Sequence, residues 1–246
     1  MSRSNPLALL FACVALLTSF GAVAAEQCTA TPAMIGAPSP TLPHLSKALA
    51  AGHVEVLAIG SGTLLGPRSS DQGGFADYAV ERLRQEWPKA DIHLTVEGTR
   101  GALASEMLTR LGGELAKHHV QLVIWQTGTV EAAHKLPTHT LAQTIVEGAR
   151  KIEASGSDLV LVDPPYIHVL AQRVDVESYA ETMREAAQET GAAIFPRFAL
   201  MKAWAQDGDI DMEKTPKAEL RTRHAELTTC LGNALGDFLL EGVQAK

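Results

Sequence analysis

The stretch HVEVLAIGSG at residues 53–62 joins an apolar run to a turn of small residues. Apolar side chains dominate from Val54 to Ile59, and Gly60, Ser61 and Gly62 end the run. A short apolar run closed by glycines predicts a β-strand over residues 53–59. Outward from it, the same pattern predicts four further strands, at residues 91–96, 120–125, 157–162 and 192–195.

Longer amphipathic segments separate these runs and predict helices. The expected helices cover residues 46–51, 75–87, 102–118, 141–154, 179–190 and about 225–241. Gly112 and Gly113 lie inside the third of them and are candidate positions for a break in it. Strands that alternate with helices at this spacing predict an α/β fold, with a mostly parallel five-stranded sheet covered on both faces.

Composition narrows the possible partners. The 246 residues are 46% hydrophobic and 20% charged, which is enough apolar material for a core. The net charge of −7 argues against nucleic acid or an anionic membrane surface as a partner, because both attract basic surfaces. The sequence thus predicts a globular, mildly acidic domain.

The N-terminus has the pattern of a secretory signal. Arg3 precedes an apolar stretch at residues 7–20, and Ala22-Val23-Ala24 has the small residues of a cleavage site. We expect residues 1–24 to be a signal peptide, whose cleavage removes Cys13 from the mature chain. Residues 25–45 are then an extended lead-in, and residues 46–246 form the α/β domain. A periplasmic or secreted protein follows, with no membrane span in its mature chain.

Export changes the interpretation of the two remaining cysteines, Cys28 and Cys230. In an oxidising compartment an isolated pair favours a disulfide, although two buried free thiols are the alternative. His134 and His139 lack the helical spacing of a metal site, and adjacent histidines at residues 118–119 rarely face the same way. We therefore predict no metal and no cofactor.

In parallel sheets, ligands bind outside the carboxyl ends of the strands. The segments 60–66, 97–101, 126–131 and 163–166 should therefore share one edge. Arg100 at this edge is interpreted as an exposed surface charge, with an anionic ligand as the alternative. Asp163, which precedes two prolines, is typical of a turn.

Several of these segments resemble blocks of the SGNH/GDSL hydrolases. GSGTLLG at residues 60–66 resembles the nucleophile block, and Gly98-x-x-Gly101 the glycine block. VIWQTGT at 123–129 is similar to the Gly-x-Asn block. DPPY at 163–166 and RFALM at 197–201 resemble further segments of an exported, proteobacterial-type branch. The resemblance covers nearly all of residues 28–240 and implies a single-domain, flavodoxin-like α/β/α sandwich of the SGNH hydrolase type.

The chain differs from this family at the positions of the catalytic residues. Gly62 stands at the position of the nucleophilic serine, and Val130, after Thr129, at that of the oxyanion-binding asparagine. Aligned on Cys230, the family's Asp-x-x-His falls on Glu219-Leu220-Arg221-Thr222, so Thr222 replaces the histidine, while Gly101 is retained. Serine hydrolysis needs a nucleophile, a base and oxyanion donors together, so the departures imply impaired catalysis.

A relocated catalytic set is the alternative. Ser61 and Thr63 flank the lost serine, and His224 lies two residues beyond the lost histidine. In a helix, two positions correspond to about 200° around the axis, which would point His224 away from the place of Thr222. The simpler interpretation is that Ser61 and Thr63 line a turn and that His224 is solvated.

Three functions follow from these observations. The leading hypothesis is an impaired SGNH-like protein that binds a small ester- or acyl-bearing ligand, or an exported partner protein, in the former active-site cleft. The second is an active ester hydrolase or deacetylase with a nucleophile at Ser61 or Thr63. The third is a non-catalytic subunit of an exported complex.

Overall fold

The structure is a computed structural model, and it describes residues 28, 31–32, 37–66, 73–208 and 210–244. The predicted signal peptide at residues 1–24, with Cys13, lies outside the described residues, as does part of the predicted lead-in. Among the described helices, none is long and apolar enough to cross a membrane.

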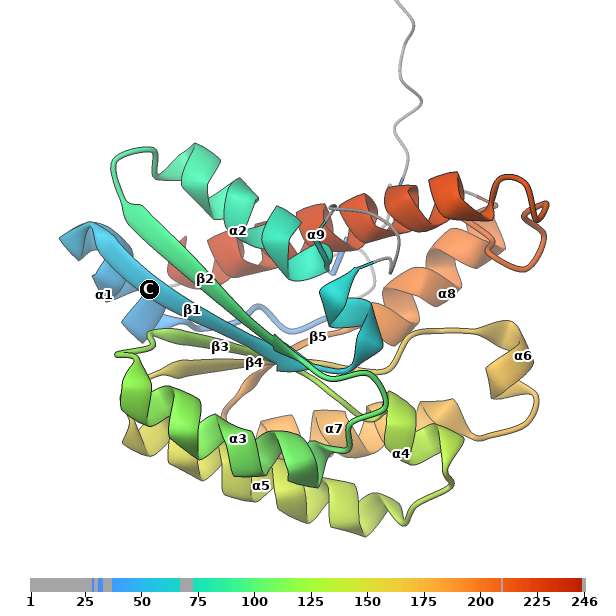
Figure 1. Cartoon of the computed structure of the whole chain (residues 1–246), viewed down its shortest axis with the longest axis horizontal. Helices are drawn as coiled ribbons and strands as arrows, with labels where there is room; N and C mark the ends of the chain where they lie inside the picture. Colours follow the sequence, from blue (N-terminus) through green and yellow to red (C-terminus); the bar gives the residue numbers. More distant parts are fainter. Residues whose placement is uncertain (1–27, 29–30, 33–36, 67–72, 209, 245–246) are drawn as a thin grey trace, which may run out of the picture.

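Five strands form one sheet in the order β2-β1-β3-β4-β5, and every neighbouring pair is parallel (Figure 1). The predicted α/β class and five-stranded sheet are confirmed. The strands are β1 (His53–Gly60), β2 (Asp91–Gly98), β3 (Leu122–Gln126), β4 (Asp158–Val162) and β5 (Ala193–Phe195).

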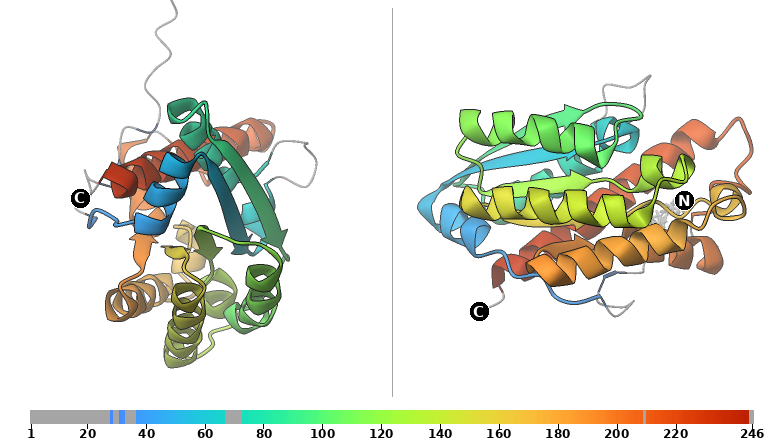
Figure 2. Two further views of the ribbon diagram at one scale, coloured as in Figure 1. Left: turned by 90° about the vertical axis from the view of Figure 1, so that its left-hand side faces the viewer. Right: turned by 90° about the horizontal axis from the view of Figure 1, so that it is seen from below.

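Helices cover both faces of the sheet, as Figures 1 and 2 show. Side chains alternate across a strand, so Val56 and Ala58 of β1 enter one core, and Leu57 and Ile59 enter the other. The first core is closed by α1 (Pro43–Ala51), α2 (Phe75–Glu86), α8 (Arg197–Asp207) and α9 (Leu220–Gln244). The second is closed by α3 (Ala104–Lys117), α5 (Thr138–Ala154) and α7 (Val176–Thr190).

Several helices differ from the predicted ones in their course or in their bounds. The helix expected over 102–118 continues through Gly112 and Gly113, whose positions face open space. The last helix begins at Leu220 rather than near residue 225. The sequence analysis did not predict α8. It also did not predict three short helices, η1 (Gly62–Leu65), α4 (Thr129–Ala133) and α6 (His168–Ala171).

The predicted disulfide is present. Cys28 and Cys230 are bonded, with 5.9 Å between their Cα atoms, across a sequence separation of 202 residues. The bond joins the start of the described chain to the middle of α9, beside the first core.

Candidate functional site

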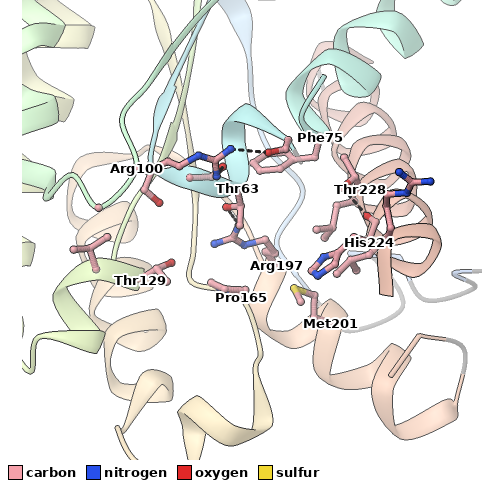
Figure 3. A pocket seen from close by; sticks show the side chains of 17 residues that line it. Thr63, Phe75, Arg100, Thr129, Pro165, Arg197, Met201, His224 and Thr228 are labelled. Carbon is pink, nitrogen blue, oxygen red and sulfur yellow. Dashed lines mark hydrogen bonds between the residues drawn. The ribbon is translucent and has the colours of Figure 1, made fainter. Parts of the chain in front are cut away.

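A cavity of about 690 Å³ opens at the carboxyl ends of the strands. Its walls come from η1, the loops after β2 and β4, and helices α4, α8 and α9 (Figure 3). Most residues that the sequence singled out line it: Ser61, Gly62, Thr63, Arg100, Gly101, Thr129, Val130 and His224. Two that do not are Glu219 and Thr222.

Helical geometry explains which residues of α9 reach the cavity. Arg221, His224, Thr228 and Leu231 line it and recur every three or four residues, so they share one face of the helix. Thr222 lies between Arg221 and Arg223 on a different face. The segment is helical from Leu220, so His224 does not take the position that Thr222 occupies.

Arg100 holds the turn that contains Gly62. Its Nη1 donates to the carbonyl oxygen of Gly62 at 3.0 Å, and its Nη2 donates to that of Gly66 at 3.1 Å. A Cβ atom at Gly62 would lie 3.1 Å from Arg100 Nη1. Arg100 is exposed, as expected, but it also braces the turn and lines the cavity.

The hydroxyl of Ser61 is bound to an amide. Ser61 is 6% exposed, and its Oγ accepts a hydrogen bond from Gln126 Nε2 at 3.1 Å. The backbone N–H of Ser61 donates to Gln126 Oε1 at 3.3 Å. Gln126 is completely buried. An amide does not accept a proton from serine at ordinary pH, so this partner does not activate Ser61 as a nucleophile.

Thr63 lies between the same amide and a buried cation. Its Oγ1 donates to Gln126 Oε1 at 3.3 Å and accepts from Arg197 Nη1 at 3.1 Å. Figure 3 shows His224 on α9, well apart from Thr63. Among the hydrogen bonds of the described residues, none joins a histidine to Ser61 or Thr63.

Arg197 is the first residue of α8 and is only 1% exposed. Besides Thr63, its Nε donates to the carbonyl oxygen of Asp163 at 2.9 Å, and its guanidinium lies 5.9 Å from the ring centre of Phe75. Nη2 has no hydrogen-bond partner. Burial lowers the pKa of Arg197 to about 10, while the negative charge of Asp163 acts to raise it. A buried cation with an unused donor therefore forms part of the cavity wall.

Asp163 is a buried carboxyl group rather than an ordinary turn residue. It is 1% exposed, and its Oδ1 accepts from the N–H of Phe198 at 2.8 Å. Burial raises the pKa of Asp163 to about 7, while the Phe198 hydrogen bond and the charge of Arg197 act in the opposite direction. The group stabilises the start of α8 by accepting one of its unpaired N–H donors.

The cavity has a positive and an apolar character. Of the described residues that line it, none is Asp or Glu, although the whole chain has a net charge of −7. Three arginines line it, and His224 is the single potential metal ligand among the described lining residues, too few for a metal centre. The apolar lining includes Phe75, Val130, Met201, Leu227 and Leu231.

Two residues of this site were missed by the sequence analysis. Gln126 ends an otherwise apolar strand, and Arg197 opens an apolar helix, so each is a polar residue in an apolar context. That context signals burial, but it does not indicate that both side chains meet at Thr63. Only the folded chain brings these distant residues together.

Comparison with known proteins supports the predicted resemblance. A family model described as the non-GDSL lipase-like family matches residues 27–245. No curated protein matches the chain in a sequence search.

Several solved structures share the fold. TesA has a TM-score of 0.58 at 18% identity, and the match covers 74% of this chain and 99% of TesA. A putative lipolytic protein of the G-D-S-L family from Desulfitobacterium hafniense has a TM-score of 0.55 at 16% identity, over 75% and 99% of the two chains. Axe2, an acetylxylan esterase from Geobacillus stearothermophilus, has a TM-score of 0.58 at 14% identity, over 78% and 95%. The predicted SGNH hydrolase-type fold is thereby confirmed.

Proposed function

The chain belongs to the non-GDSL lipase-like family, and we propose that it is an exported, catalytically impaired member that binds an acyl-bearing anion in its cavity. The observation that carries this proposal is the guanidinium of Arg197, which is buried in the cavity wall with Nη2 unpaired. Buried donors without a partner are rare and costly, so a ligand that accepts from this group would be stabilised.

Impaired hydrolysis is supported by the groups around Gly62. The family's serine position has no side chain, and the turn there is braced by Arg100. Val130 offers no amide to a developing oxyanion. The neighbouring hydroxyls of Ser61 and Thr63 are bound to Gln126 instead of a base.

Two features of the cavity support an anion with an apolar body. Guanidinium groups bind carboxylate and phosphate by charge-assisted hydrogen bonds, and no carboxylate among the described lining residues competes for them. The apolar wall around Met201 and Leu231 would remove an acyl chain from water. An acetylxylan esterase and a putative lipolytic protein share this fold, which agrees with an acyl-type ligand.

Calorimetric titration with decanoate, decyl phosphate and decanol tests the ligand class. Both anions should bind more tightly than the neutral alcohol, and comparing the anions separates carboxylate from phosphate recognition. Arg197→Gln should weaken anion binding about tenfold or more, because a charge-assisted hydrogen bond contributes about 1.5–3 kcal/mol. Arg221→Gln removes an exposed charge of the cavity and should weaken binding several-fold without affecting folding.

The matched control is Arg150→Gln, an exposed arginine of α5 that does not line the cavity. It should leave the affinity unchanged. Equal affinity for decanol and the anions, or equal losses in Arg221→Gln and Arg150→Gln, would overturn the anion assignment.

A fluorophosphonate probe tests the catalytic state. Intact mass of the exported protein should show no adduct, while an active SGNH hydrolase is labelled in the same buffer. An adduct mapped to Ser61 or Thr63 would favour the alternative, an active hydrolase with a rearranged nucleophile. Recovery of the chain outside the cytoplasm without residues 1–24 checks the proposed export, and co-purification of a partner would favour the subunit hypothesis.

A further inference from the structure

Four side chains with metal-binding groups meet on β1 and β2, at the end of the sheet opposite the cavity. The parallel register places His53 beside Asp91 and Glu55 beside His93. Residues two apart on a strand share a face, so all four side chains project from the same face of the sheet. Within the described part of the chain, this is the one place where three or more His, Cys, Asp or Glu residues could hold an ion.

The groups are already close to one another. His53 Nε2 lies 3.3 Å from Glu55 Oε1, and its Nδ1 lies 3.4 Å from Asp91 Oδ2. His93 Nε2 lies 3.0 Å from Asp91 Oδ2. The ligand atoms of His53, Glu55 and His93 all lie within 4.8 Å of one another. Ligands about 2.0–2.2 Å from a tetrahedral ion are about 3.4 Å apart, so small side-chain rotations suffice.

Folding does not require this arrangement. The side chains of His53, His93 and Asp91 are 56%, 55% and 67% exposed, so burial does not force them together. β2 is the edge strand of the sheet, and the cluster spans it and β1. An ion bound here would join the two strands at their N-terminal ends.

We propose that His53, Glu55 and His93 bind a divalent late transition metal ion, with Asp91 orienting His53 through Nδ1. Imidazole with a carboxylate suits Zn²⁺, Ni²⁺ or Cu²⁺, whereas Mg²⁺ and Ca²⁺ prefer oxygen ligands alone. A carboxylate on the second ring nitrogen is the usual outer partner of a metal-bound histidine. This site is independent of the proposed function of the cavity.

The sequence did not suggest this site because its ligands come as two separate pairs, His-x-Glu and Asp-x-His, on strands that only the fold aligns. Within each strand, a pair of polar residues two positions apart is the usual pattern of a strand with one exposed face, so neither pair alone indicates a metal site. The register adds the cross-strand contact between His53 and Asp91 and places Glu55 beside His93.

Titration of the protein with Zn²⁺, after removal of metal by chelation and without a histidine tag, tests the site. Calorimetry should show one ion per chain, and Zn²⁺ should raise Tm. His93→Gln and His53→Gln should each weaken Zn²⁺ binding by at least tenfold, and Asp91→Asn by a smaller factor. These residues are exposed, so the variants should fold normally.

His139→Gln is the matched control, because His139 is exposed and lies on α5, away from the cluster. It should bind Zn²⁺ as the unchanged protein does. Unchanged affinity in the His53→Gln/His93→Gln double variant, or binding of several ions with equal losses in His139→Gln, would show dispersed surface binding and overturn the proposal.

Discussion

Arg197 Nε donates a 2.9 Å hydrogen bond to the backbone carbonyl of Asp163, while the Asp163 carboxylate accepts from the N–H of Phe198, the residue after Arg197. Asp163, which follows β4, thus accepts two hydrogen bonds from the start of α8, one on its backbone and one on its side chain. Both side chains are buried beside the cavity. The backbone carbonyl of Asp163 thus positions the cation that we assign to ligand binding, and its carboxyl group holds the first turn of α8.

Stability should fall as pH rises from about 4 to about 7. The pKa of Asp163 is about 7 in the folded protein and near its ordinary value of 3.8 when unfolded. Between these values the folded state binds more protons, so its stabilisation is complete at low pH and is lost as pH rises through about 7. The effect is a few kcal/mol at most.

The measurement is Tm against pH for the unchanged protein and Asp163→Asn, which keeps an acceptor for Phe198. This variant should show a flatter profile over the same range. Asp207→Asn, an exposed carboxylate of α8, is the control and should retain the slope. Parallel profiles for all three proteins would contradict the assignment of the slope to Asp163.

Gly62→Ser should fold normally but remain inactive. The added Cβ meets the flexible end of Arg100 at 3.1 Å, so stability should change by no more than about 1 kcal/mol. A hydroxyl at this position would still lack the asparagine and histidine of SGNH hydrolases, whose places the sequence comparison predicts at Val130 and Thr222. Fluorophosphonate labelling and ester turnover should stay at background, and an adduct at position 62 would show that a base is present.

Removing the disulfide should destabilise the fold without changing the cavity. The bond between Cys28 and Cys230 closes 202 residues, and such a loop contributes about 2–5 kcal/mol by restricting the unfolded chain. Cys28→Ser/Cys230→Ser should show this loss in denaturant unfolding, with unchanged ligand affinity. Two free thiols in the denatured, unreduced protein would contradict the bond itself.

Two glycines should respond to alanine in opposite directions. A Cβ at Gly148 would overlap the ring of Trp125 in the second core, so Gly148→Ala should cost about 1–3 kcal/mol. Gly113 lies in α3 with open space around it, so Gly113→Ala should stabilise by about 0.5–1 kcal/mol. Equal unfolding midpoints for the two variants would contradict this packing of α5 on β3.

Local patterns were sufficient for the fold because periodicity acts over a few residues. The apolar runs of β1, β3 and β4 and the amphipathic segments between them identify an α/β sandwich, and the strand ends identify the edge where Gly62 and Gly101 lie. The signal-peptide pattern and the count of two remaining cysteines favoured the disulfide between Cys28 and Cys230 that the structure contains. Helix starts were less accurate, since α9 begins at Leu220 rather than near residue 225.

The site itself was decided by tertiary structure. Whether Ser61 and Thr63 face a base or an amide depends on Gln126 and Arg197, which come from a different strand and a helix. The His53–His93 cluster likewise exists only because β1 and β2 pair in one register. Composition and periodicity determine which residues are buried and in which element. The direction of each polar side chain, and the partner it meets, depend on packing between segments far apart in the chain.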